Sequence, residues 1–320
     1  MMCGFNDIMT QVALARDFAK KESRVLIVDT RASSLWDNLD EYLIPIDALA
    51  LTTRLNPEKI AELNKLSCSP SCWQGRIEFI FRDAQIRMNI GTSKKPLLQR
   101  LKYIYLALSL RTEDPFHGGF LLRMKFILSL PSRFGVKRKD ILPGADLLVV
   151  NQAGGGNQGI YGLALFRLSE NARIVVRQAQ SVLGSDYDAI HIRDTDISSD
   201  YRDFLLQISS QLASRRVLVC SDNPLAIGDA RSILSRSEVV TVTKTRQTFG
   251  TGQHLQSHLM TSNQIRQNNL NMLTDLICLA GSTKLFVAKP KSGFSGFSNL
   301  VQALQKRPDI IRQLVGTNIE

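Results

Sequence analysis

Residues 187–196 read YDAIHIRDTD and decide how this chain folds. An apolar strand is predicted at Ala189–Ile192, and it runs directly into a charged turn. His191 and Arg193 stand two positions apart, so their side chains lie on the same side of the strand. In an open α/β sheet, polar residues at the carboxyl end of a strand form ligand sites. The alternative is a core strand whose end is only solvated by charge.

Strands and helices alternate through the second half of the chain. Apolar, β-branched runs are each followed by an amphipathic segment, an order typical of a parallel, doubly wound α/β sheet. The predicted strands are residues 189–192, 216–221, 239–242 and 285–288, and the predicted helices are residues 161–167, 171–183, 200–212, 224–234, 266–281 and 298–305.

The first part of the chain has a similar but less regular pattern. Residues 4–7 are predicted to form a loop that leads into a helix at 7–22, and an apolar strand follows at 24–29. A further helix is predicted at 57–66 and a strand at 76–81. Helix followed by strand is half of a βαβ unit, so this part is also predicted to be α/β.

A glycine-rich stretch at 151–159 follows a predicted strand at 146–150. It predicts either a linker between two domains or a turn whose backbone amides hold a phosphate. The stretch lacks the lysine of a P-loop and the spacing of a dinucleotide fingerprint, which favours the structural turn.

Charge and composition narrow the class of protein. The chain has 320 residues and a formal net charge of +11, which predicts an acidic partner such as a phosphorylated molecule, nucleic acid or an anionic membrane. Residues 94–139 hold eleven basic and two acidic residues, interleaved with apolar ones. Amphipathic helices with basic faces are predicted there, either solvated on the surface or docked on an anionic membrane.

The cysteines and the apolar runs bear on the compartment. No run of eighteen apolar residues and no signal-peptide pattern is present. Cys220 and Cys278 lie in apolar runs and are predicted to be buried free thiols, while Cys68 and Cys72 lack partners for a zinc site. A reducing cytoplasm is therefore predicted. His254 and His258 lack a visible third ligand, so no metal is predicted there either. 

Polar residues follow three of the predicted strands, and parallel strands place them at one sheet edge. Arg193 offers a fork of donors for a phosphate, and residues 292–298 offer hydroxyls and amides at a helix start. Asp222, within residues 221–223, offers a carboxylate for paired N–H donors. Together they predict a nucleotide-diphosphate site. Each also has a plainer interpretation: an ion pair of Arg193 with an adjacent acid, and helix capping by Asp222 and the serines.

These motifs resemble those of the α-1,6- and protein O-fucosyltransferase superfamily, and most nearly the bacterial nodulation fucosyltransferases. The resemblance covers roughly residues 1–45 and 145–305. The matching segments are His191–Asp196, Ser221–Asn223, Gly293–Gly296, the helix segment Asn271–Leu276, and the opening Gly4–Asp7 with the strand Val25–Asp29.

The resemblance implies a GT-B fold, in which two Rossmann-like domains with parallel sheets face a cleft. Residues 1–145 would form the acceptor-side domain, including the basic segment 94–139, and residues 146–320 would bind the donor nucleotide. It further implies an inverting transfer of fucose, or a similar sugar, from a GDP-sugar to a glycan hydroxyl, with no metal or other cofactor.

Carried over by position, the resemblance implies that Arg193 grips the β-phosphate and stabilises the leaving diphosphate. His191 would lie against the nucleotide and Asp222 would read guanine. The other donor-binding residues would be Gly4, Asp7, Ser221, Asn223, Ser292, Ser295 and Gly296, with Gly4 and Asp7 reaching the cleft from the other domain. The chain departs from the family at Asn6, where a glycine is usual.

No motif identifies the general base. Asp196 and Asp200 are the carboxylates nearest to Arg193 in sequence, and either could deprotonate an acceptor hydroxyl. The favoured interpretation is that Asp196 orients Arg193 and that Asp200 caps the following helix.

The predicted function is thus a cytoplasmic fucosyltransferase-like enzyme of polysaccharide biosynthesis. Its acceptor would be a glycan, lipid-linked or at the cell surface, and segment 94–139 would place it at the inner membrane face. One alternative is the same fold with another nucleotide sugar. Another is a non-catalytic, basic module that binds a nucleotide, RNA or membrane; aromatic residues make up only 7% of the chain and no stacking motif is present, so no nucleic-acid partner is expected.

Overall fold

The structure is a computed structural model that describes residues 4–30, 38–53, 55–69, 74, 75, 77, 144–149, 156–195, 198–244, 260–291 and 295–316. The described residues form two compact units, one from the ranges between 55 and 149 and one from all the others. The basic segment 94–139 lies outside the described residues, as do nearly all of the predicted strand 76–81, the pair His254 and His258, and Cys72.

The smaller unit contains helix α2 (Pro57–Leu63) and the strands β4 (Cys68–Ser69) and β5 (Leu147–Leu148). The two strands pair in parallel. Helix α2 begins where the sequence predicts, because the Asn56 carboxamide accepts the Lys59 amide N–H at 2.8 Å and Pro57 occupies the first turn.

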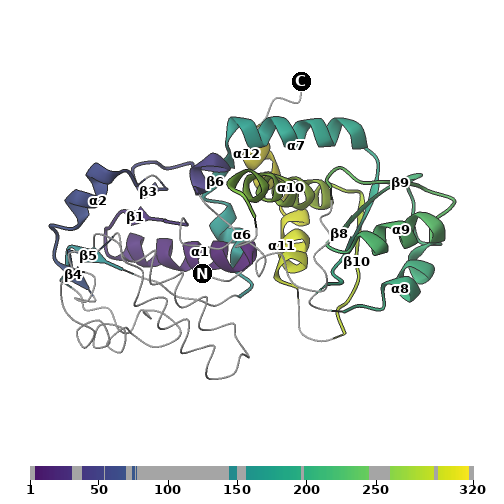
Figure 1. The fold of residues 1–320 in the computed structure, drawn as a ribbon, viewed down its shortest axis with the longest axis horizontal. Helices are drawn as coiled ribbons and strands as arrows, with labels where there is room; N and C mark the ends of the chain where they lie inside the picture. The colour runs from purple at the N-terminus through teal and green to yellow at the C-terminus, as the bar shows by residue number, and fades with distance from the viewer. Residues whose placement is uncertain are drawn as a thin grey trace. The chain divides into compact units, whose positions relative to one another are not determined.

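The larger unit is built on a parallel sheet (Figure 1). This sheet has four strands. Its strands lie in the order β10 (Lys284–Val287), β7 (Asp188–Ile192), β8 (Arg216–Ser221) and β9 (Glu238–Val240). Every residue of β7 is buried, as expected for a strand with neighbours on both sides and helices on both faces. The predicted parallel α/β sheet is therefore confirmed.

Helices α8 (Tyr201–Ile208) and α9 (Pro224–Ile233) cover one face of this sheet (Figure 1). Ile190 and Ile192 of β7 are fully buried against them. Burial of each such side chain stabilises the fold by about 1.5–3 kcal/mol, so the strand is held firmly up to its last residue. The strand end can therefore present the following residues at a defined position.

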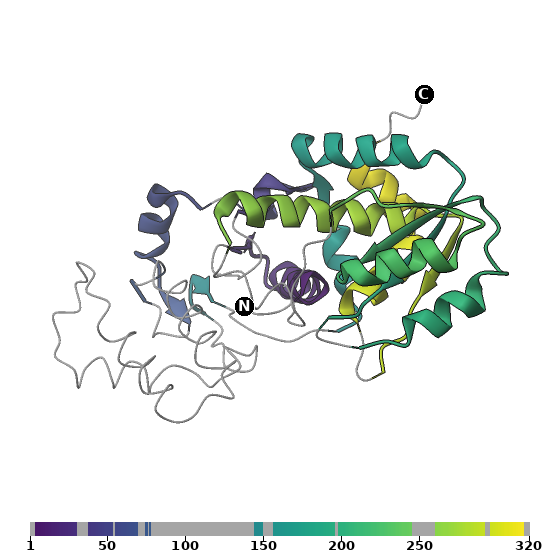
Figure 2. The same ribbon diagram turned by 45° about the vertical axis from the view of Figure 1, so that its right-hand side comes forward.

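The opposite face is covered by α7 (Glu170–Leu183), α10 (Ser262–Ala280) and α11 (Gly296–Gln305). Figure 2 shows the long yellow-green helix α10 beside the teal helix α7. Because side chains alternate along a strand, Ala189 and His191 point to this second face. The last helix, α12 (Pro308–Val315), was not predicted; Pro308 starts it in the first-turn position that proline favours.

Helix α1 (Phe5–Lys21) packs on α6 (Gly159–Leu163) and reaches α11. The predicted loop at residues 4–7 is wrong: Gly4 is the N-cap, and its carbonyl accepts the Asp7 and Ile8 amides in the first turn of α1. Helix α1 thus belongs to the larger unit, although the predicted boundary after residue 145 assigned it to an N-terminal domain. That boundary stays a prediction.

Close packing of α1 and α6 depends on small residues. A Cβ atom at Gly162 would overlap the backbone of Met9, so only glycine fits there. Asn6 is buried, and its side-chain amide donates to the Gly156 carbonyl at 2.8 Å. Gly296 also leaves room for Asn6, since a Cβ there would stand 3.3 Å from the Asn6 amide nitrogen. The side chain of Asn6, at a position where the resembling family usually has glycine, is therefore accommodated by a glycine on the adjacent helix α11.

The predicted helix at 161–167 is wrong in its second half. Helix α6 ends at Leu163, and residues Phe166–Leu168 form strand β6, which pairs antiparallel with β2 (Leu43–Pro45). The pairing partner lies more than a hundred residues away, so local periodicity did not reveal it. A 3-10 turn (Leu39–Glu41) contacts β2. Strands β1 (Leu26–Ile27) and β3 (Leu51–Thr52) pair in parallel.

Candidate functional site

The carboxyl ends of β10, β7 and β8 meet at one edge of the sheet, because these strands are parallel neighbours. This edge carries His191 and the residues that follow β7, and Ser221 at the end of β8. The sequence predicted this convergence from the alternation of strands and helices, which indicates a parallel sheet. Asp196 and Ser292, which were also predicted to belong here, lie outside the described residues.

His191 lies in the sheet with its ring turned toward α11. Its Nδ1 atom lies 2.9 Å from the Ser298 hydroxyl oxygen, and its ring is tilted on Phe297 at 5.0 Å between centroids. Burial, aided by the positive charge of Arg193, lowers the pKa of His191 to about 3. The ring is therefore neutral at physiological pH and offers a flat, uncharged contact rather than a cation.

Arg193 follows β7 and forms an ion pair with Asp222, which follows β8; Nη1 and Oδ2 are 2.9 Å apart. The Arg193 side chain is 24% exposed and the Asp222 side chain 11%. A guanidinium carries five N–H donors in a planar fork, and this geometry suits a phosphate group. One pairing partner of Arg193 is thus an acid that follows the neighbouring strand β8. The predicted pairing of Arg193 with Asp196 stays a prediction, since Asp196 lies outside the described residues.

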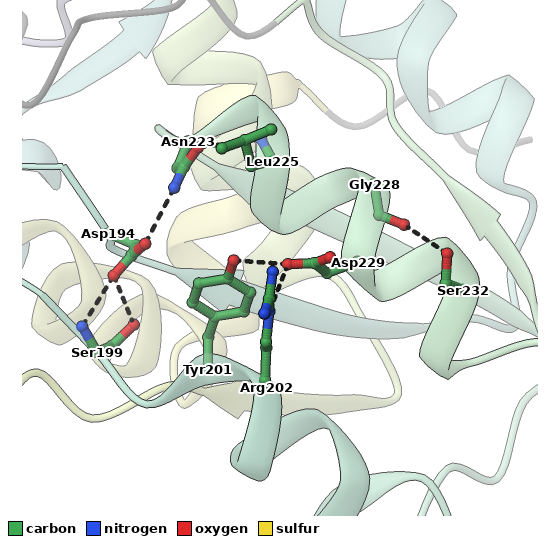
Figure 3. Close-up of polar contacts among 9 residues, drawn as sticks. All are labelled: Asp194, Ser199, Tyr201, Arg202, Asn223, Leu225, Gly228, Asp229 and Ser232. Atoms are coloured by element: carbon green, nitrogen blue, oxygen red, sulfur yellow. Dashed lines mark hydrogen bonds and ion pairs between the residues drawn. The ribbon is translucent and has the colours of Figure 1, made fainter.

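The turn after β7 is tied to the start of α9. Asp194 accepts the Ser199 amide N–H at 2.9 Å and the Asn223 side-chain amide at 3.0 Å, as Figure 3 shows. Asn223 in turn caps α9 by accepting the Leu225 amide at 3.0 Å. The helix-capping role proposed for Asp222 is therefore filled by Asn223.

Helix α11 begins at this edge with Ser295 as its N-cap, whose hydroxyl accepts the Ser298 amide at 3.3 Å. The plainer prediction, a capping role for the serine and glycine run, is confirmed at this residue. A helix N-terminus also presents free backbone N–H groups, which favour an anion. Gly4 and Asp7, at the start of α1, belong to the same unit as α11. The neighbouring residue Asn6 lies close to Gly296 of α11.

Asp200 precedes α8 and pairs with Lys291, whose Nζ lies 2.5 Å from its Oδ1. Both side chains are more than half exposed. The hydrogen bond that Lys291 donates to Asp200, together with the negative charge of that carboxylate, raises the pKa of Lys291. Asp200 makes no side-chain cap to α8, contrary to the favoured interpretation, because its carboxylate turns to Lys291 instead.

Asp275, on the face of α10 that packs on the sheet, was missed as a site residue. Its carboxyl accepts the Thr243 hydroxyl at 2.8 Å and hydrogen-bonds the thiol of Cys220, the register neighbour of His191. Burial raises the pKa of Asp275 to about 6. The signal in the sequence was an acid within an otherwise apolar stretch of a helix. An ionisable group held at such cost marks a functional-site candidate.

Two other predictions concern thiols and metals. Cys220 and Cys278 are buried free cysteines, as predicted, and burial raises the pKa of both thiols. Within the described ranges, no group of three or more His, Cys, Asp or Glu side chains is placed to hold a metal ion.

None of the helices described is both long and apolar enough to span a membrane.

Open α/β sheets bind their ligands at an edge of this kind, where polar strand ends meet the start of a helix. The fold of the chain is of the GT-B type. It matches the crystal structure of NodZ α-1,6-fucosyltransferase co-crystallized with GDP, with a TM-score of 0.52 and 14% identity over 94% of this chain and 89% of that one.

Two further crystal structures show the same similarity. NodZ from Bradyrhizobium is 14% identical, with a TM-score of 0.51 over 94% of this chain and 90% of that one. NodZ soaked with GDP-fucose is 15% identical, with a TM-score of 0.52 over 94% and 89%. No protein-family model and no curated protein matches the chain. The expected resemblance to nodulation fucosyltransferases is thus confirmed at the level of the fold.

Proposed function

We propose that this chain is an inverting, metal-independent glycosyltransferase that moves fucose, or a similar sugar, from a GDP donor to a glycan hydroxyl. The observation that carries the proposal is Arg193, a guanidinium held by Asp222 at the carboxyl edge of a parallel sheet. The fold it occurs in is that of NodZ, solved with GDP and with GDP-fucose.

The chemistry requires stabilisation of the leaving diphosphate. Cleavage of the bond between the sugar and the phosphate builds negative charge on the β-phosphate oxygens. A positioned guanidinium and the free N–H groups at the start of α11 stabilise that charge more in the transition state than in the ground state. We assign the first role to Arg193 and the second to the backbone at Ser295 and Gly296.

We assign recognition of the base to Asp275. Guanine presents adjacent N–H donors on one edge, and a carboxylate can accept both, whereas adenine has no such pair. The Thr243 hydroxyl orients the Asp275 carboxyl. Cys220, the other hydrogen-bond partner of Asp275, is the register neighbour of the neutral His191. The sequence assigned this role to Asp222, but the Asp222 oxygens are already engaged with Arg193 and the turn after β7.

The acceptor is proposed to be a glycan, lipid-linked or at the cell surface, reached from the cytoplasm. Docking of the basic segment 94–139 on an anionic membrane would bring the enzyme to such an acceptor. The general base is proposed to be Asp196 or Asp200. Asp200 is accessible for that task, since its side chain is 67% exposed, but it must first leave Lys291.

The test is product analysis by mass spectrometry after incubation with GDP-fucose and a panel of glycans. We expect an acceptor that gains one deoxyhexose with release of GDP, and loss of that product with Arg193→Ala. The matched control is Arg202→Ala, since Arg202 pairs with Asp229 on α9 and should be dispensable. Equal activity of the Arg193 and Arg202 variants would exclude the proposed mechanism.

A further inference from the structure

The carboxylate of Asp222 serves the end of β7 with both of its oxygens. Oδ1 accepts the Asp194 backbone N–H at 2.8 Å. Oδ2 accepts the Thr195 hydroxyl at 2.7 Å and lies 2.9 Å from Nη1 of Arg193. A carboxylate has about four lone-pair positions, and three are occupied here by consecutive residues of one turn. Little capacity remains for a ligand that needs both oxygens on one side.

The turn that Asp222 holds is anchored a second time. Asp194 bonds Ser199 on one side and Asn223 on the other, and Asn223 is the N-cap of α9 (Figure 3). The position of Arg193 therefore depends on two acids that are themselves hydrogen-bonded. Such a closed network leaves a side chain few alternative positions.

We propose that Asp222 is a positioning residue that sets the guanidinium of Arg193 for the donor diphosphate and does not contact the base. This inference rests on the proposed function. An arginine side chain that no other residue holds must lose rotamer freedom when it binds a phosphate. Here that ordering is achieved during folding, so the donors of Arg193 are in place before the ligand arrives and need no reorganisation as charge develops.

The inference separates the phosphate half of the ligand from the base half. A positioning residue for Arg193 affects affinity for GDP but not for guanosine, which has no phosphate. A residue that reads guanine affects both ligands equally. We therefore expect Asp222→Asn to weaken GDP binding roughly 10- to 100-fold, the loss of one charged hydrogen-bond partner, and to leave guanosine affinity unchanged.

The experiment titrates GDP by calorimetry and guanosine by ligand-observed NMR into the full-length protein and its variants. The variants are Asp222→Asn, Arg193→Ala and the double variant, with Asp229→Asn as the matched control. Asp229 is also a hydrogen-bonded acid, with Tyr201 and Arg202 as partners, but it lies between α8 and α9. We expect the double variant to bind GDP no more weakly than Arg193→Ala alone, because Asp222 acts through Arg193.

Three outcomes overturn the inference while GDP still binds the wild-type protein: equal weakening of guanosine and GDP by Asp222→Asn, additive losses in the double variant, or unchanged GDP affinity. If the wild-type protein does not bind GDP, the proposed function itself falls. Melting curves check folding. If Asp222→Asn does not fold, Asp222→Glu keeps the charge but displaces the carboxylate, and the same selective loss of GDP affinity is expected.

Discussion

Replacement of Asp275 by asparagine should stabilise the protein and abolish nucleotide binding together. Burial raises the pKa of this carboxyl from its ordinary value of 3.8 to about 6. The folded chain therefore holds the proton more tightly than the unfolded chain, and stability decreases as the pH rises from about 4 to about 6. At pH 7.5 the full cost of the buried charge is present, and asparagine removes it.

The magnitude follows from the shift. A difference of about two pKa units corresponds to about 3 kcal/mol, since each unit is worth about 1.4 kcal/mol. Part of this gain is offset, because the hydrogen bonds from Thr243 and Cys220 are weaker to an amide than to a carboxylate. We expect a net increase of about 1–3 kcal/mol in the free energy of unfolding, a rise of a few degrees in Tm for a chain of this length.

The assay is thermal melting at pH 7.5 and at pH 4.5, with calorimetric titration of GDP. The stabilisation by Asp275→Asn should shrink at pH 4.5, and GDP affinity at pH 7.5 should fall at least about 100-fold with the loss of two charged hydrogen bonds. Asp229→Asn is the control: Tyr201 and Arg202 lower the pKa of Asp229, so its neutralisation should destabilise the fold and spare GDP binding. A destabilised Asp275→Asn protein with intact GDP binding would refute this reasoning.

Other substitutions test the packing and the neutral histidine. Burial lowers the pKa of His191 to about 3, so below pH 6.5 the imidazole is protonated in the unfolded chain but not in the folded chain. The free energy of unfolding of the wild-type protein, relative to His191→Gln, should therefore fall by on the order of 2 kcal/mol between pH 8 and pH 5. Parallel profiles of stability against pH for the two proteins would contradict this. Gly162→Ala should destabilise by about 1–3 kcal/mol in denaturant titrations, because its Cβ would overlap the Met9 backbone. Gly228→Ala, in an open position on α9, should stabilise by about 0.5–1 kcal/mol, and equal effects of the two glycine variants would refute the close packing. 

Local signals predicted the sheet and most of its helices. The apolar runs of β7 and β8 are long enough to specify buried strands, and Asn223 with Pro224 marks the start of α9. Strand β6 was predicted as helix because its partner β2 comes from a distant part of the chain. The first turn of α1 was predicted as a loop, but glycine also serves as an N-cap, and Gly4 does so here.

The sequence predicted which strand ends meet at the site, but not the side-chain contacts between them. Parallel strands brought Arg193 and Asp222 to one edge, as expected from the alternation of strands and helices. The direct ion pair between them depends on side-chain positions that spacing does not encode. Asp275 was missed because it reaches the edge from a helix face, so no strand-end motif contains it.

The most direct test of the central claim is a side-by-side calorimetric titration of GDP, UDP and ADP into the wild-type protein. The proposal predicts saturable binding of GDP, weaker binding of the other two nucleotides, and weakened GDP binding with Arg193→Ala. No heat with GDP at millimolar concentration, or tighter binding of UDP or ADP, would contradict the assignment of a GDP-sugar site to this sheet edge.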